Sequence, residues 1–346
     1  MLTTKQIEEI REHLNNAQNP VFFFDNDQDG LCSFILLQRY IGRGKGFPIK
    51  TSPDLTKDYF RKVEEFNSDY IFILDKPEVS EEFIAEVEKK NIPIVWIDHH
   101  NTPKERISKY ANYYNPLLSK EKTNEPVTYI CQKIANKKED LWIAMVGCIS
   151  DNFVPPFYED FIKDFPDLCK DYKNAFDILY GTDIGKIARI IGFGLKDTIS
   201  NVISMVKFLI SSKGPYDFLE ENPKNKTIHK RFEEIDKKYQ RLLSKAKKEG
   251  LSGNLIFFKY AGDTSMSSDI ANGLKYLFPK KFIIVAYTKG AKINISGRGN
   301  NVREVVLKAI SEIKNSTGGG HENAVGAQIP KEDMEQFEKN IRELTN

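Results

Sequence analysis

The sequence predicts an α/β protein with an N-terminal parallel-sheet domain, a helical connector and a smaller C-terminal α/β domain. A chain of 346 residues is long enough to bury two hydrophobic cores. Its first half alternates short apolar runs with amphipathic helical patterns, and a second alternation follows a helical middle. We therefore expect a first domain at 1–195, a connector at 196–250 and a second domain at 251–346.

Three apolar runs define the first sheet: 21–25, 70–75 and 94–98. Each is short, rich in β-branched and aromatic residues, and lacks alternating polarity, which is typical of strands buried on both faces of a parallel sheet. Helical patterns at 32–42 and 80–90 lie between them. Each run ends in an aspartate, and ligands of open α/β sheets bind beyond the carboxyl ends of the strands. The three carboxylates therefore indicate one shared site.

The second half begins with a helical region, roughly 156–250, in which the segment 224–249 carries a narrow apolar stripe on a charged helix. A second α/β unit follows. Its expected strands are 255–260, 282–288, 292–298 and 324–329, and its expected helices are 267–278, 302–313 and 332–344.

Composition limits the classes of function that the chain could have. The formal net charge of +2 is close to balance, so any basic surface for a nucleic acid must be local. The four cysteines form no CxxC pair and no disulfide framework, which favours a reducing, cytoplasmic setting. We expect no secretory signal and no membrane association, because the apolar stretches are too short to span a bilayer.

The strongest local signal is the run Asp25, Asp27, Asp29 followed by Gly30. Alternate positions of an extended segment share a face, so the three carboxylates lie side by side and repel unless cations neutralise them. Such an oxygen-rich cluster suits Mg²⁺ or Mn²⁺. An EF-hand is excluded, because its twelfth position would be Leu36 and a strand precedes the loop. A merely solvated, aspartate-rich turn stays open.

Asp98, His99 and His100 end the third strand. Adjacent residues of an extended segment point to opposite sides, so one histidine could bind a metal while the other reaches the substrate. Ordinary strand-end polar residues are an equally open alternative. Asp75 and Asp151 taken alone would be helix caps or turn residues.

Gly318, Gly319 and Gly320 precede His321, and we expect their backbone N–H groups to form an anion-binding nest just before a strand. Arg298, in the run Ser296 to Gly299, could bind a phosphate with two hydrogen bonds. No GK[ST] follows the glycines, so the motif is not a P-loop. A flexible loop is the competing interpretation.

Taken in order, these motifs resemble the DHH phosphoesterase superfamily with a DHHA1 domain, and its RecJ-like members in particular, over residues from about 20 to 330. The resemblance implies two divalent cations, Mn²⁺ favoured and Mg²⁺ as the alternative. It implies metal ligands at Asp25, Asp27, Asp29, Asp75, His99 and Asp151, with Asp75 bridging. It implies catalytic roles for Asp75, Asp98, His99 and His100, with Asp98 orienting the histidines. It implies substrate contacts from His100, Ser296, Arg298, Gly318, Gly319, Gly320 and His321.

The resemblance also implies an active site in the cleft between the domains and an exonuclease that degrades single-stranded DNA or RNA from one end. A two-metal-activated water would release nucleoside 5′-monophosphates. The size is closest to small archaeal RecJ-like nucleases associated with a helicase, which favours 3′→5′ polarity and allows a helicase or a replication or repair protein as partner. Hydrolysis of short oligonucleotides or cyclic dinucleotides is the alternative. A non-enzymatic replication scaffold is disfavoured, because every proposed ligand position carries a donor. The oligomeric state stays open.

Overall fold

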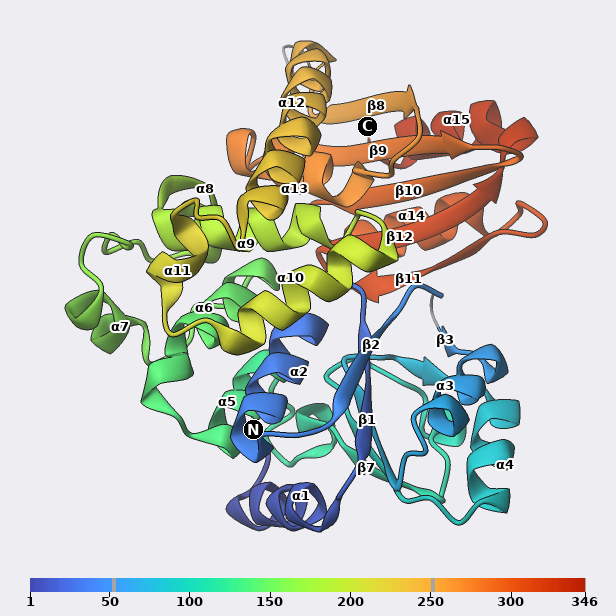
Figure 1. Ribbon diagram of the computed structural model, residues 1–346. Helices are drawn as coiled ribbons and strands as arrows, with labels where there is room; N and C mark the ends of the chain where they lie inside the picture. Colours follow the sequence, from blue (N-terminus) through green and yellow to red (C-terminus); the bar gives the residue numbers. More distant parts are fainter. Residues whose placement is uncertain (52–53, 250–252, 346) are drawn as a thin grey trace. The chain divides into compact units, whose positions relative to one another are not determined.

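The computed structural model describes residues 1–51, 54–249 and 253–345. The chain forms two compact units, Met1–Phe232 and Glu233–Asn346, and the division falls inside helix α12 (Lys226–Glu249) (Figure 1). The boundary predicted after residue 195 stays a prediction, and the one predicted after residue 250 lies outside the described residues.

The first unit is built on a five-stranded parallel sheet in the order β2-β1-β4-β6-β7. The strands are β1 (Pro20–Asp25), β2 (Lys45–Ile49), β4 (Tyr70–Leu74), β6 (Ile94–Ile97) and β7 (Ala111–Tyr114). The three predicted strands are its centre, which confirms the parallel-sheet prediction. Sequence reasoning missed the two edge strands. One contains Pro48, which an edge tolerates, and the other is only four residues long. A two-stranded sheet, β3 (Asp54–Leu55) with β5 (Glu78–Val79), lies apart.

Helices cover both faces of this sheet, which explains why its three central strands are continuous apolar runs. Helices α2 (Gln28–Ile41), α5 (Val127–Ala135) and α6 (Leu141–Ser150) lie on one side of the sheet, and α3 (Phe60–Glu65) and α4 (Glu81–Lys89) lie on the other (Figure 1). Phe22 and Phe24 belong to the larger core with the first group of helices, whereas Phe23 packs in the core with the second. Helix α1 (Thr4–Asn16) precedes the sheet in the chain. All four cysteines are buried and free.

The predicted helical middle is confirmed, because residues 156–249 contain only helices and their connections. The helices are α7 (Tyr158–Asp164), α8 (Ala175–Gly181), α9 (Asp183–Gly194), α10 (Ile199–Ser211), α11 (Pro215–Leu219) and α12. Over the described residues, every helix is too short or too polar to cross a membrane.

The second unit has a five-stranded sheet in the order β11-β12-β10-β9-β8, in which only β8 and β9 run parallel. The strands are β8 (Leu255–Ala261), β9 (Phe282–Lys289), β10 (Lys292–Arg298), β11 (Thr317–His321) and β12 (Ala324–Pro330). The helices are α13 (Ser267–Leu277), α14 (Val302–Ile310) and α15 (Met334–Thr345). The smaller α/β domain predicted for this region is confirmed.

The expectation of an anion nest at Gly318, Gly319 and Gly320 is wrong. These residues are part of β11 and pair with β12 in antiparallel register, with Gly319 opposite Gly326. Successive N–H groups of a strand point in alternating directions, so they cannot converge on one anion. Of the three, only Gly320 has a positive φ, 136°.

Candidate metal centre

The junction of β1 and α2 places the first three carboxylates. Asp25 is the last residue of β1, and Asp27 is the N-cap of α2, where its Oδ1 accepts a hydrogen bond from the Gly30 amide at 3.0 Å. A Cβ at Gly30 would lie 2.5 Å from the carbonyl oxygen of Asp25, so this close turn requires glycine. Asp29 follows in the first turn of the helix.

Asp29 is buried and serves as the cap of a second helix. Its Oδ2 accepts from the Val127 amide at 2.9 Å and its Oδ1 from the Thr128 amide at 2.7 Å. These are the first two amides of α5, whose own N-cap residue is Pro126 and makes no side-chain cap. The helix terminus therefore stabilises the charge of Asp29. This role was not predicted, because nothing local in the sequence joins residues 29 and 127.

Asp75 follows β4 in a left-handed conformation, φ +59°, and its amide donates to the carbonyl of Ile97 at 3.0 Å. Its carboxylate is buried, and Oδ1 has no hydrogen-bond partner among the described residues. Burial, and then the charges of Asp29 and Asp27, raise the pKa of Asp75 well above its ordinary value. A buried acceptor in this position is poised for a cation.

His99 lies among three of these carboxylates. Its Nε2 is 3.3 Å from Asp75 Oδ1 and 3.9 Å from Asp29 Oδ2, while its Nδ1 is 3.8 Å from Oδ2 of Asp151. Burial alone would lower the pKa of His99, but the charges of Asp151 and Asp29 outweigh it and the pKa is raised. Asp151 caps the carboxyl end of α6 and is about one-third exposed.

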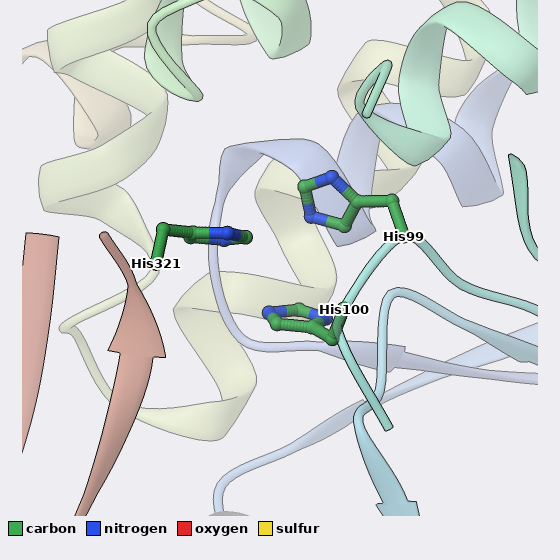
Figure 2. A group of neighbouring side chains, drawn as sticks. All are labelled: His99, His100 and His321. Carbon is green, nitrogen blue, oxygen red and sulfur yellow. The ribbon is translucent and has the colours of Figure 1, made fainter. Parts of the chain in front are cut away.

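The two histidines do not point to opposite sides, contrary to the sequence-based expectation. Their ring centroids are 4.7 Å apart, and the rings lie side by side (Figure 2). The physical reason is that β6 ends at Ile97, so the alternation of an extended strand no longer applies at residues 99 and 100.

Asp98 orients the His100 ring through a contact with its Nδ1. Its Oδ1 is 2.8 Å from His100 Nδ1, and its Oδ2 accepts from the Tyr113 hydroxyl at 3.0 Å. Although burial opposes it, the interaction with His100 lowers the pKa of Asp98. Burial likewise opposes the charge of His100, but Asp98 and then Asp75 raise the pKa of His100 to about 9. His100 is therefore protonated at neutral pH and donates from Nδ1.

Asp27 completes the group. Part of its side chain is exposed to solvent, yet restricted hydration of the carboxyl group, followed by the charges of Asp25 and Asp29, raises the pKa of Asp27 to about 7. Mutual repulsion of this kind is what bound cations relieve.

These residues fit a divalent cation. One ligand atom each from Asp29, Asp75 and His99 lies within 4.8 Å of the others. Carboxylate oxygens with one imidazole suit Mn²⁺ or Mg²⁺, and the buried Asp75 Oδ1 without a hydrogen-bond partner supplies an acceptor that a cation would satisfy.

Asp25 differs from the other carboxylates, because a buried lysine contacts it. Lys76 Nζ lies 2.9 Å from Asp25 Oδ1 and donates to the carbonyl of Thr51 at 2.6 Å. The lysine side chain is only 1% exposed. Sequence reasoning missed Lys76. Its position directly after Asp75, a predicted site residue, is the signal that could have identified it.

The second unit gathers four of its six predicted substrate residues, Ser296, Arg298, Gly319 and His321, on one sheet face. In the register of the sheet, Ala324 of β12 pairs with both Arg298 and His321, and Gly326 pairs with both Ser296 and Gly319. Residues opposite one another, and two apart along a strand, share a face. Gly318 is on the other face, because a Cβ there would meet α14, as is Gly320, which neighbours Gly319 along the strand.

Two side chains on this face are fixed by α13. Arg298 Nε donates to Asn272 Oδ1 at 2.6 Å, and the Ser296 hydroxyl lies 2.9 Å from that of Ser267. A Cβ at Gly319 would meet nothing within 4 Å, so the space above this glycine on the sheet face is open. His321 ends β11 and is labelled in Figure 2. The arrangement could bind an anion through side chains, in place of the expected nest.

Comparison with known proteins agrees with this geometry. Residues 21–149 match the family model described as the DHH family, N-terminal domain, and residues 253–346 match the DHHA1 domain. No protein of curated function matches the sequence. Among solved structures, the chain resembles RecJ from Thermus thermophilus in complex with Mn²⁺, with a TM-score of 0.69 and 13% identity. That match covers 99% of this chain and 54% of the other, so the chain spans about half the length of that RecJ.

Two further solved structures are similar. An exonuclease RecJ bound to manganese has a TM-score of 0.64 and 14% identity, over 97% of this chain and 92% of that one. The pGpG-specific phosphodiesterase PggH from Vibrio cholerae has a TM-score of 0.51 and 14% identity, over 94% and 99%. At these identities, the likenesses show a shared fold.

Proposed function

Because the chain carries a DHH domain and a DHHA1 domain and so belongs to the DHH/DHHA1 superfamily, we propose that it is a RecJ-like, metal-dependent exonuclease. Its substrate would be single-stranded DNA or RNA, degraded from one end to nucleoside 5′-monophosphates, with 3′→5′ polarity favoured. The observation that carries the proposal is the cluster of Asp29, Asp75 and His99, whose ligand atoms converge within 4.8 Å.

Metal binding follows from the same residues. Asp29, Asp75, His99 and Asp151 would hold one divalent cation, and Asp27 with Asp75 would face a second, Mn²⁺ being favoured. Such ions lower the pKa of a water and stabilise charge on phosphoryl oxygens. In the metal-free protein, burial and the neighbouring carboxylates raise the pKa values of Asp27 and Asp75, which supports a cation as the missing partner.

His100 is the group best suited to the scissile phosphate. Asp98 and Asp75 keep it protonated at neutral pH, and Asp98 fixes the ring through Nδ1. A fixed cationic donor stabilises the charge that develops on phosphoryl oxygens during in-line displacement. Tyr113 and Asp98 act by orienting His100.

In the second unit, Arg298, His321 and Ser296 would bind the terminal phosphate and sugar over Gly319. The planar guanidinium of Arg298, which Asn272 holds in place, is suited to a phosphate. Gly319 has no side chain and therefore permits close approach of the substrate backbone. The likeness to RecJ structures supports single-stranded nucleic acid as partner, and a helicase or a replication or repair protein is proposed from the family resemblance alone.

One experiment tests this function. The protein is incubated with Mn²⁺ and short and long oligonucleotides labelled at either end, as DNA and as RNA, with the His99→Gln variant as the matched control. We expect the strand labelled at one end to give a ladder of shortened products and the strand labelled at the other end to release its label as a mononucleotide. The variant should give neither. Cleavage confined to the shortest oligomers or to cyclic dinucleotides would replace the exonuclease by the alternative phosphodiesterase. No hydrolysis of any substrate would refute an enzymatic function.

A further inference from the structure

Lys76 is the one lysine side chain among the described residues with only 1% exposure. Lysine is almost never fully buried unless it is paired, and here the pair is with Asp25. The lysine backbone is fixed as well: its carbonyl accepts from Trp96 Nε1 at 2.8 Å, and the next carbonyl, of Pro77, accepts from the Thr102 hydroxyl at 2.8 Å. The ammonium is thus a built-in feature at the end of β4.

The contact commits one oxygen of Asp25. Oδ1 accepts from Lys76 Nζ at 2.9 Å and from the Asn26 amide at 3.0 Å. The ammonium also neutralises the carboxylate charge at contact distance. By contrast, Asp75 Oδ1 has no hydrogen-bond partner among the described residues. The side of the cluster near Asp25 therefore attracts a divalent cation less than the side formed by Asp29, Asp75 and His99.

We propose that Lys76 is a built-in cation that makes the two metal positions unequal, tight at Asp29, Asp75 and His99 and weak beside Asp25 and Asp27. The proposal rests on the proposed metal-dependent function. It assigns Asp25 to Lys76 and not to the metal, which departs from the ligand role that the family resemblance implies for Asp25.

Charge balance supports this assignment. Asp25, Asp27, Asp29, Asp75 and Asp151 are five carboxylates, and one ammonium leaves four negative charges, which two divalent cations neutralise. His100 and Asp98 balance each other as a separate pair. Without Lys76 the site would carry an excess negative charge on the side of Asp25, and the weaker cation would bind there more tightly.

The test measures Mn²⁺ binding directly, without substrate. Chelator-treated wild type, Lys76→Met, Asp25→Asn and the double variant are titrated with Mn²⁺ by calorimetry, and electron paramagnetic resonance counts the bound ions. Methionine has an unbranched chain that suits the buried path of Lys76. In the wild type we expect one tight ion and a second that binds at least about tenfold more weakly.

The proposal predicts how each variant changes the Mn²⁺ affinity of the weak position. Lys76→Met tightens the weak position by at least about tenfold, because one repelling charge is gone, and Asp25→Asn weakens it, because the ammonium is left unopposed. The double variant stays close to the wild type, because a neutral pair has been removed. The tight position keeps its affinity throughout.

Three results would overturn the proposal. They are equal affinities at both positions of the wild type, no tightening in Lys76→Met, and loss of the second ion in the double variant, which would make Asp25 a ligand. If Lys76→Met fails to fold, the double variant, which removes the ion pair together, and the wild type still decide. Failure of the nuclease assay with unequal Mn²⁺ binding intact would refute the proposed function alone, and absence of Mn²⁺ binding in the wild type would refute both.

Discussion

Replacing Asp75 by Asn should stabilise the metal-free protein and remove its stabilisation by Mn²⁺. Asp75 is buried, its Oδ1 has no hydrogen-bond partner among the described residues, and its pKa is raised well above 3.8 by burial and by Asp29 and Asp27. A raised pKa of an acid means that its ionised form destabilises the fold. Asparagine removes that charge and tolerates the left-handed backbone, φ +59°, as aspartate does.

The magnitude follows from general costs. A buried polar group without a partner costs about 1–3 kcal/mol, and a unit of the size of Met1–Phe232 changes its Tm by roughly 2–4 °C per kcal/mol. In EDTA at pH 8 the Asp75→Asn variant should melt roughly 2–12 °C above the wild type. The gain is fully present above the folded-state pKa of Asp75. It shrinks as the pH falls and vanishes near the ordinary value of 3.8.

Manganese should narrow this difference in Tm or reverse it. At 100 times its Kd, an ion that binds only the folded state adds about 2.7 kcal/mol, or roughly 5–10 °C for this unit. The wild type gains this shift and the variant does not. The assay is thermal unfolding by circular dichroism from pH 4 to 8, with EDTA or Mn²⁺. If the variant melts below the wild type in EDTA at pH 8, or keeps the Mn²⁺ shift, Asp75 is a structural residue and the argument fails.

Three further predictions concern the other groups. Asp29→Asn should destabilise the metal-free protein by about 1–2 kcal/mol, because an amide cannot accept from both Val127 and Thr128; urea unfolding in EDTA checks this, and unchanged stability would contradict the capping role. His99→Ala should abolish hydrolysis while far-UV circular dichroism stays native, and near-normal turnover would refute the site. Arg298→Ala or His321→Ala should raise the KM for oligonucleotides but leave Mn²⁺ binding and hydrolysis of bis-p-nitrophenyl phosphate unchanged; loss of Mn²⁺ binding with substrate affinity intact would place that residue in the metal shell.

The sequence could predict the parts of the fold that local pattern determines. Strands β1, β4 and β6 follow from continuous apolar runs, and their carboxyl ends meet at one edge of a parallel sheet whatever their order. Asp75 and His99 could therefore be expected together before the strand order was known, and their atoms lie 3.3 Å apart.

What sequence reasoning missed depends on contacts between distant segments. Lys76 reaches Asp25 only because β4 is the direct neighbour of β1, and several strand orders were compatible with the pattern. The glycines at 318–320 carry no side-chain pattern, so only pairing with β12 makes them a strand. The ring orientation of His99 and His100 likewise depends on β6 ending at Ile97, and element boundaries are the least certain part of a sequence-based prediction.

Three of the carboxylates differ in what stabilises their charge before any metal binds. A lysine neutralises Asp25, helix amides neutralise Asp29, and Oδ1 of Asp75 has no hydrogen-bond partner among the described residues. Removing the charge should therefore have opposite effects in EDTA: Asp29→Asn destabilises the fold, because the helix needs that carboxylate, whereas Asp75→Asn stabilises it. The fold thus tolerates an unfavourable carboxylate at residue 75, and a bound cation is the partner that would offset this cost.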